Sequence, residues 1–177
     1  SKEEIEKILL KGDSETDNTN RLLEKFERLK LERQPFYIDI EDLEEILIWK
    51  LLGQVGRQRE FRKQNTNENV IAITKAAFSI SHVSKDYETE LRLKLLTALA
   101  GVEVPVASAI LTLCFPEEYS VIDFRNWRQV FPDNPDKSQY TFKDYVQYLD
   151  VIQKVSIQFE MKPQQIDLAI WLKDKEN

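Results

Sequence analysis

The chain has 177 residues, of which 42% are hydrophobic and 32% charged, and its net charge is −6. This length is typical of one domain with a substantial core. A single cysteine, Cys114, excludes an internal disulfide and any metal or iron–sulfur site made of cysteines alone. With only four glycines and six prolines, we expect an all-α fold of long helices with short connections.

The polar and apolar stretches also bear on where the protein works. No apolar stretch approaches the ~20 residues that a membrane-spanning helix needs. The first residues lack the charged-then-apolar pattern of a secretory signal. We therefore expect a cytoplasmic protein that does not insert into membranes.

The charge is unevenly distributed. Residues 1–48 hold eight Lys and Arg against fourteen Asp and Glu, whereas the two signs balance in the remaining residues. This acidic region is a candidate surface for a protein partner. A basic group follows it, and either a DNA-binding patch or a solvated loop accounts for such a group. Its members are Lys50, Arg57, Arg59, Arg62 and Lys63.

The N-terminal third divides into a polar segment and the start of a helical domain. Residues 1–18 are expected to be a polar segment, with a turn or frayed linker at 12–18, and residues 19–177 a single domain. Apolar side chains at three- and four-residue spacing predict a helix from Thr19 that stops at Pro35. A second helix is predicted from about residue 40.

Six more helices are predicted further along, about eight in total. They start near Asn67, after Ser84 or Asp86, at Pro105, at Asp123, after Thr141 and at Pro163. Residues 106–115 are apolar on nearly every side, so this helix should be the buried centre of the domain. Gly101 suits the C-terminal end of the helix before it, where a positive φ is common.

The order of helix, Gly101-Val102 turn, apolar helix and aspartate resembles the hairpin region of the helix-hairpin-helix DNA glycosylase superfamily. In that family the turn reads Leu-Pro-Gly-Val-Gly, and its amides, often with a monovalent cation, hold a DNA phosphate. The resemblance implies that residues 101–104 contact DNA. Glu103 replaces the second glycine here, next to Val104. Pro105 replaces the lysine of the strand-cleaving members, so the resemblance implies no lyase activity. It implies no cofactor besides the monovalent cation at the turn.

Asp123 matches the family's catalytic aspartate. It follows the hydrophobic pair Val121-Ile122 and lies 22 residues after Gly101. A carboxylate there would stabilise the positive charge that builds on the deoxyribose as a base leaves. The simpler interpretation is that Asp123 caps the helix 124–131, and both can hold at once. Candidate walls for a base pocket are Trp49, Trp127 and Tyr119.

Other side chains are candidates for DNA contact. Gln54 lies where some members place a glutamine wedge that replaces the extruded base. Arg57 and Arg59 belong to the basic group, and Arg125 and Arg128 follow the aspartate. Solvent exposure without a ligand is the alternative for each of these arginines.

Two functions are consistent with these patterns. The first is a monofunctional DNA glycosylase that acts in repair on duplex DNA. The second is a non-catalytic relative of that fold, acting as an interaction module or weak DNA binder, since one fold hosts many functions. No metal site is predicted under either interpretation.

Overall fold

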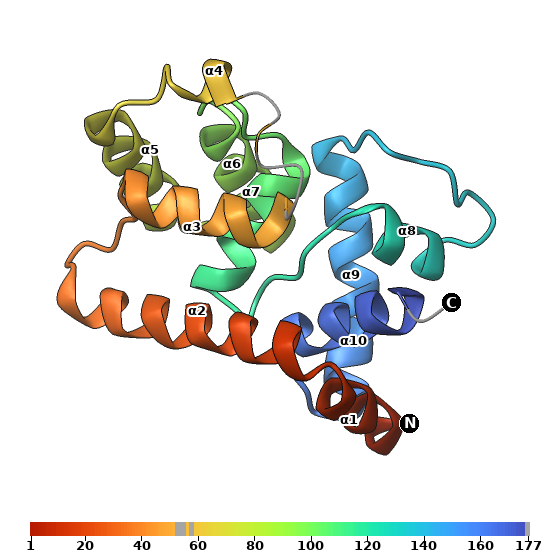
Figure 1. Ribbon diagram of the computed structural model, residues 1–177. Coiled ribbons are helices and arrows are strands. Elements are labelled where there is room, and N and C mark those ends of the chain that lie inside the picture. Colours follow the sequence, from red (N-terminus) through yellow and green to blue (C-terminus); the bar gives the residue numbers. More distant parts are fainter. Residues whose placement is uncertain (52–55, 57–58, 176–177) are drawn as a thin grey trace.

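The computed structural model describes residues 1–51, 56 and 59–175, and all regular structure in these ranges is helical (Figure 1). This confirms the expected all-α class. The helices of the described ranges are α1 (Lys2–Lys11), α2 (Asp13–Glu32), α3 (Ile40–Leu51), α4 (Arg59–Arg62), α5 (Asn67–Ser79), α6 (Lys85–Leu96), α7 (Val104–Cys114), α8 (Phe124–Val130), α9 (Phe142–Phe159) and α10 (Pro163–Lys175).

The eight helices predicted from the sequence all form, and α1 and α4 are additional. The expectation of a turn or frayed linker at residues 12–18 is wrong. Residues 2–11 form α1, which Ser1 caps, and α2 already begins at Asp13. Helix α1 is mostly polar, but it has a short apolar stripe. Ile5 packs against the core, and α1 lies along α10. Gly12 joins α1 to α2. Any other residue at this position would place its β-carbon 2.5 Å from a methyl carbon of the Leu172 side chain.

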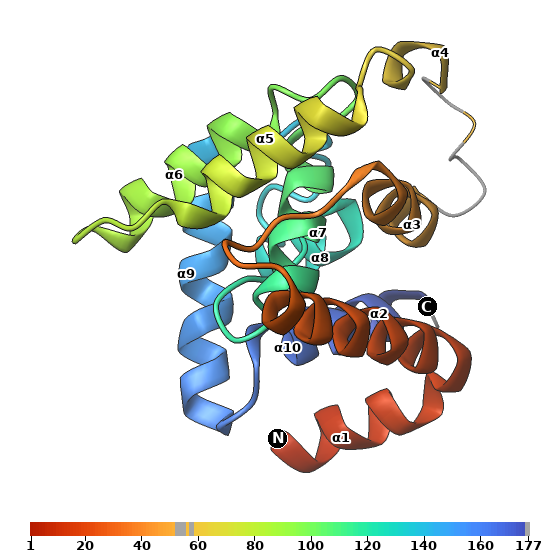
Figure 2. The ribbon, with the colours of Figure 1, turned by 90° about the vertical axis from the view of Figure 1, so that its left-hand side faces the viewer.

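Helix α7 is the centre of the fold, as its composition predicted. Every residue of α7 except Pro105 is buried. Helices α2, α3 and α6 pack around it, and α5 lies beside α6 (Figures 1 and 2). The C-terminal helix α10 packs against α1, α8 and α9. The chain between α7 and α8 therefore joins the helices around α7 to those around α10.

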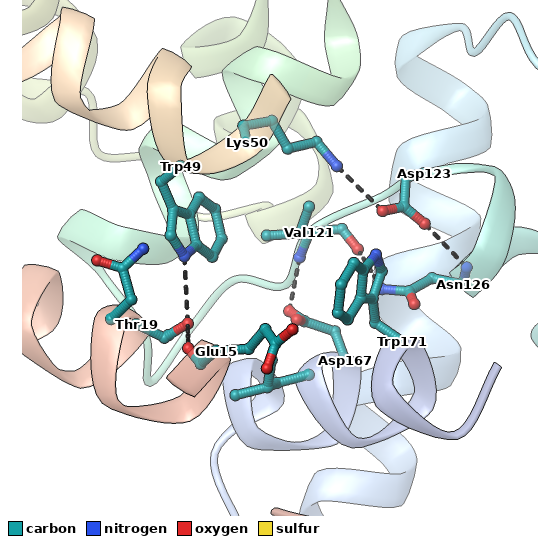
Figure 3. Close-up of a pocket in the computed structure, with 11 residues that line it drawn as sticks. Glu15, Thr19, Trp49, Lys50, Val121, Asp123, Asn126, Asp167 and Trp171 are labelled. Atoms are coloured by element: carbon teal, nitrogen blue, oxygen red, sulfur yellow. Dashed lines mark hydrogen bonds and ion pairs between the residues drawn. The ribbon is translucent and has the colours of Figure 1, made fainter. Parts of the chain in front are cut away.

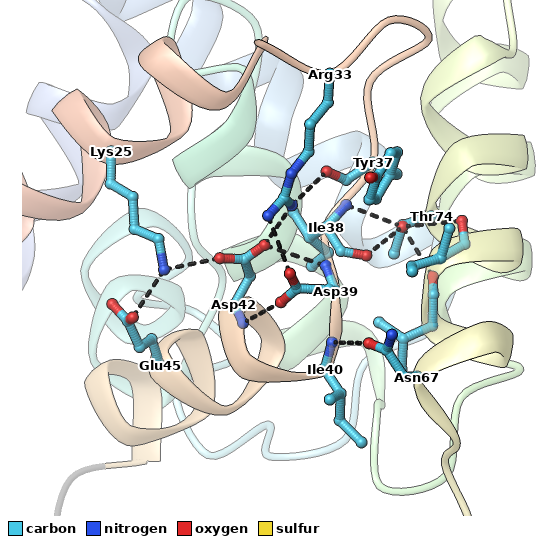
Figure 4. Close-up of polar contacts among 12 residues, drawn as sticks. Lys25, Arg33, Tyr37, Ile38, Asp39, Ile40, Asp42, Glu45, Asn67 and Thr74 are labelled. Atoms are coloured by element: carbon cyan, nitrogen blue, oxygen red, sulfur yellow. Dashed lines mark hydrogen bonds and ion pairs between the residues drawn. The ribbon is translucent and has the colours of Figure 1, made fainter.

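A buried polar cluster holds the connection between α2 and α3 (Figure 4). Asp42, which is 2% exposed, lies 2.7 Å from the Lys25 ammonium and 2.6 Å from the Arg33 guanidinium. The amide of Ile38 donates to the Thr74 hydroxyl at 3.2 Å, which ties the connection to α5. Polar side chains thus satisfy the backbone of a segment that has no helical hydrogen bonds of its own.

Across the ranges that the structure describes, no helix combines the length and the apolar character needed to cross a bilayer.

Candidate functional site

An open pocket lies where α2, α3, α8 and α10 meet (Figure 3). About 90 Å³ inside it can be reached by the centre of a water molecule, and the empty space is about 570 Å³ when the open solvent at the mouth is included. Two tryptophans, two aspartates and a lysine contribute to its wall. These residues are Trp49, Lys50, Asp123, Asp167 and Trp171.

Asp123 caps α8, as the sequence predicted, and also faces this pocket. Its Oδ1 accepts hydrogen bonds of 3.0 Å from the amides of Arg125 and Asn126. Its Oδ2 accepts from the ammonium of Lys50 at 3.1 Å. The side chain of Asp123 is 16% exposed. The carboxylate is therefore held in one orientation by partners on α3 and α8, and it still reaches the solvent in the pocket.

Three helices fix the backbone just before Asp123. The amide of Val121 donates to Asp167 of α10, at 2.6 Å. The carbonyl of Val121 accepts from the Tyr148 hydroxyl of α9, at 2.9 Å. The amide of Ile122 donates to the Ser108 hydroxyl of α7, at 3.1 Å. The hairpin helix α7 thus helps to position the residue that precedes the aspartate, which gives the site a rigid base.

Asp167 is the second acid of the pocket, and the sequence reasoning missed it. It is 5% exposed, and burial raises the pKa of its carboxyl well above the usual value. The hydrogen bond from Val121 opposes this shift, and the nearby charge of Asp123 adds to it. The environment therefore favours the neutral acid. An aspartate among the apolar residues of 166–172 was a signal that could have marked it.

Two indole rings stand on opposite sides of the pocket (Figure 3). Trp49 donates from Nε1 to the Thr19 hydroxyl at 3.2 Å, which fixes its ring against α2. Trp171 of α10 lies 5.7 Å from the Arg125 guanidinium. The other aromatic candidates do not line the pocket, because Trp127 and Tyr119 are buried in the core.

Lys50 is another residue whose place at this site sequence reasoning missed. The basic group 50–63 was apparent in the sequence, but nothing local connects Lys50 with an aspartate 73 residues away. Its side chain is 10% exposed and ends at Asp123. Lys50 reaches the aspartate from α3, whereas Pro105 lies at the start of α7.

The hairpin turn forms as predicted, at a distinct depression of the surface. Gly101 has φ 77°, and Val102 and Val104 are buried whereas Glu103 is exposed. The amide of Val102 is used within the turn, where it donates to Leu99 at 3.1 Å. The depression at the turn and the pocket at Asp123 share no lining residue among those described. Phosphate and cation binding at the turn stay predictions.

The basic candidates lie in different surroundings. Arg59 is exposed at the start of α4, and α4 contributes Phe61 to the depression at the hairpin. Arg125 pairs with Asp174 at 2.9 Å, and Arg128 donates to the same carboxylate from Nε at 2.7 Å. Both arginines thus tie α8 to α10. Gln54 and Arg57 lie outside the described residues.

Comparison with known protein families, with curated proteins and with solved structures finds no match to this chain. In the described ranges, no group of three or more His, Cys, Asp or Glu side chains is arranged to hold a metal ion.

Proposed function

We propose that this protein is a monofunctional DNA glycosylase of the helix-hairpin-helix type, which removes a base from duplex DNA in repair. The observation that carries the proposal is the position of Asp123, a fixed carboxylate at an open pocket with an indole ring on either side. A base extruded from the duplex needs a pocket with aromatic or apolar walls. Departure of the base needs a negative charge beside the sugar.

The arrangement around Asp123 supports electrostatic catalysis. Two amides and Lys50 hold both carboxylate oxygens, so little reorganisation is needed when positive charge develops on the deoxyribose. The ion pair with Lys50 also balances the charge of Asp123 in the absence of DNA. A water molecule between Asp123 and the sugar would then attack the sugar carbon.

The hairpin supplies the second part of the proposal. The turn at Gly101 and Val102, with the exposed Arg59 on neighbouring α4, would hold the phosphate backbone while the base enters the pocket. The negative charge of Glu103 opposes this binding. Replacing it by glycine should therefore strengthen DNA binding, and unchanged affinity with an unchanged salt dependence would contradict a phosphate site at the turn.

Base release from defined duplexes tests the activity. The protein is incubated with duplexes that carry uracil, alkylated purines, oxidised guanine or a mismatch, and alkali then cleaves the abasic strand. Asp123→Asn should abolish release on the substrate that is processed. Asp144→Asn is the matched control, because Asp144 also lies at a helix start and pairs with a lysine, at 2.7 Å. No release by the wild type on any duplex would refute the proposal.

A non-catalytic interaction module is the second candidate function. Two observations favour it: Arg125 and Arg128 are paired with Asp174, and Glu103 is exposed at the hairpin. Both reduce the positive potential that a DNA-binding surface needs. The acidic residues 1–48 would then offer the surface for a protein partner. Weak DNA binding together with silence in the base-release assay would support this candidate.

A further inference from the structure

Asp167 is unusual for a buried carboxyl because no cation pairs with it among the contacts described. Its Oδ2 accepts a 2.6 Å hydrogen bond from Val121, which is a neutral donor. In the part of the chain that the structure describes, three other aspartates and glutamates are buried, and they differ: Asp42, Glu88 and Asp174 each lie within 3.2 Å of a lysine or arginine nitrogen. Burial of a carboxyl without a cationic partner favours its protonated form.

The same carboxyl lines the pocket that contains Asp123 (Figure 3). The two acids enter the pocket from different elements, Asp167 from α10 and Asp123 from the start of α8. Asn126 also lines the pocket and is 1% exposed, and its Oδ1 is a buried acceptor with no hydrogen-bond partner. The wall thus combines a carboxylate paired with Lys50, a carboxyl with no cationic partner among the described contacts, and an unsatisfied amide oxygen. Two acids in such different surroundings are typical of an acid and charge-stabiliser pair.

We propose that Asp167 donates a proton to the departing base, so that the pocket takes neutral purines, whose ring nitrogens must be protonated as they leave. This inference rests on the proposed glycosylase activity. A purine that already carries a positive charge, such as 7-methylguanine, needs no proton from the protein. The two kinds of purine therefore separate the role of Asp167 from the role of Asp123.

The step balances as a hydrolysis. The bond between the sugar carbon and the base nitrogen breaks, and its electron pair stays with the base. The proton of the Asp167 carboxyl moves to a ring nitrogen of the base, while Asp123 stabilises the cationic sugar. The oxygen of a water molecule bonds to the sugar carbon, and the proton that this water loses passes to solvent. Solvent then returns a proton to Asp167.

Other groups near Asp167 set the pH dependence of this donor. Burial favours its neutral form, and the charge of Asp123 acts in the same direction, whereas Lys50 acts against it. Activity on neutral purines should therefore fall as the pH rises through the raised pKa of Asp167. The titratable groups around it are Glu15 of α2, Lys50 of α3, Asp123 before α8, and Tyr145 and Tyr148 of α9.

The experiment compares Asp167→Asn with the wild type on two duplexes, one with hypoxanthine or oxidised guanine and one with 7-methylguanine. The asparagine oxygen can still accept from Val121, so the fold should persist. We expect release of the neutral purine to fall about 10²- to 10⁴-fold, which is the usual contribution of general acid catalysis. Release of 7-methylguanine should fall far less than release of the neutral purine, and a circular dichroism spectrum like that of the wild type would show that the variant is folded.

The outcomes separate this inference from the proposed function. Equal rates for Asp167→Asn and wild type on the neutral purine would overturn the role of Asp167 and leave the glycosylase proposal intact. An equal loss on both purines would assign Asp167 a positioning role and overturn proton donation. No release of either base by the wild type would overturn both proposals. Asp123→Asn should reduce release of both purines, because both generate a cationic sugar.

Discussion

Replacing Asp42 by asparagine tests how far the buried polar cluster stabilises the fold (Figure 4). Removing one partner of a buried ion pair costs about 3–5 kcal/mol, since the other charge stays buried. Here Lys25 keeps Glu45 at 2.7 Å, and Arg33 keeps Asp39 at 2.9 Å. We therefore expect a loss near the lower limit, about 3 kcal/mol. The unfolding free energy of a typical domain is about 5–15 kcal/mol, so this loss would be a large part of it.

The loss should depend on pH with a defined sign. Burial alone would raise the pKa of Asp42, but the hydrogen bonds from Lys25 and Arg33 outweigh it and lower the pKa below its usual value. The contribution of the carboxylate is therefore complete above about pH 4 and disappears as the pH falls through the lowered pKa. Urea unfolding, followed by circular dichroism at a series of pH values, measures both the loss and its decline in acid.

A surface ion pair provides the control. Asp150 pairs with Lys154 at 2.6 Å, but the side chains are 56% and 73% exposed. Asp150→Asn should therefore cost no more than about 0.5 kcal/mol. A loss for Asp42→Asn as small as that of the control would refute the reasoning. So would a difference between wild type and Asp42→Asn that persists undiminished in acid.

Three further predictions concern the junctions around the site. Hydrogen bonds lower the pKa of Asp174 to about 2. Asp174→Asn should therefore lower the unfolding free energy by about 1 kcal/mol at neutral pH, once solvent screening is allowed for. The loss should vanish when the unfolding assay is run at a pH below that pKa. Gly12→Ala should lower the unfolding free energy by about 1 kcal/mol, because overpacking exceeds the entropic gain, and Leu172→Ala should remove this loss. Borohydride reduction during incubation with DNA should trap no covalent complex, because the side-chain nitrogen of Lys50 is held at Asp123, at 3.1 Å. A trapped complex that Lys50→Met abolishes would contradict this prediction.

Much of the fold could be predicted because its signals are local. The Thr141 cap of α9 and the positive φ of Gly101 both occur as predicted. The apolar run that became α7 is buried as expected. The same reasoning failed at residues 1–18, where charged side chains outnumber the few apolar ones. Packing of α1 on α10 stabilises a helix that its composition alone does not favour.

Part of the candidate site could likewise be predicted from local signals, and part could not. Asp123 could be found from its own neighbourhood, since a cap is a contact with amides two and three residues further along. Its contact with Lys50 and the burial of Asp167 in the same pocket could not. These side chains come from α3 and α10, and they meet only because of how those helices pack around α7 and α8. Residue spacing along the chain therefore determined eight of the helices, the turn and the capping aspartate. Helix packing brought the second acid and the lysine to that aspartate, because charges distant in sequence interact only after the core has formed.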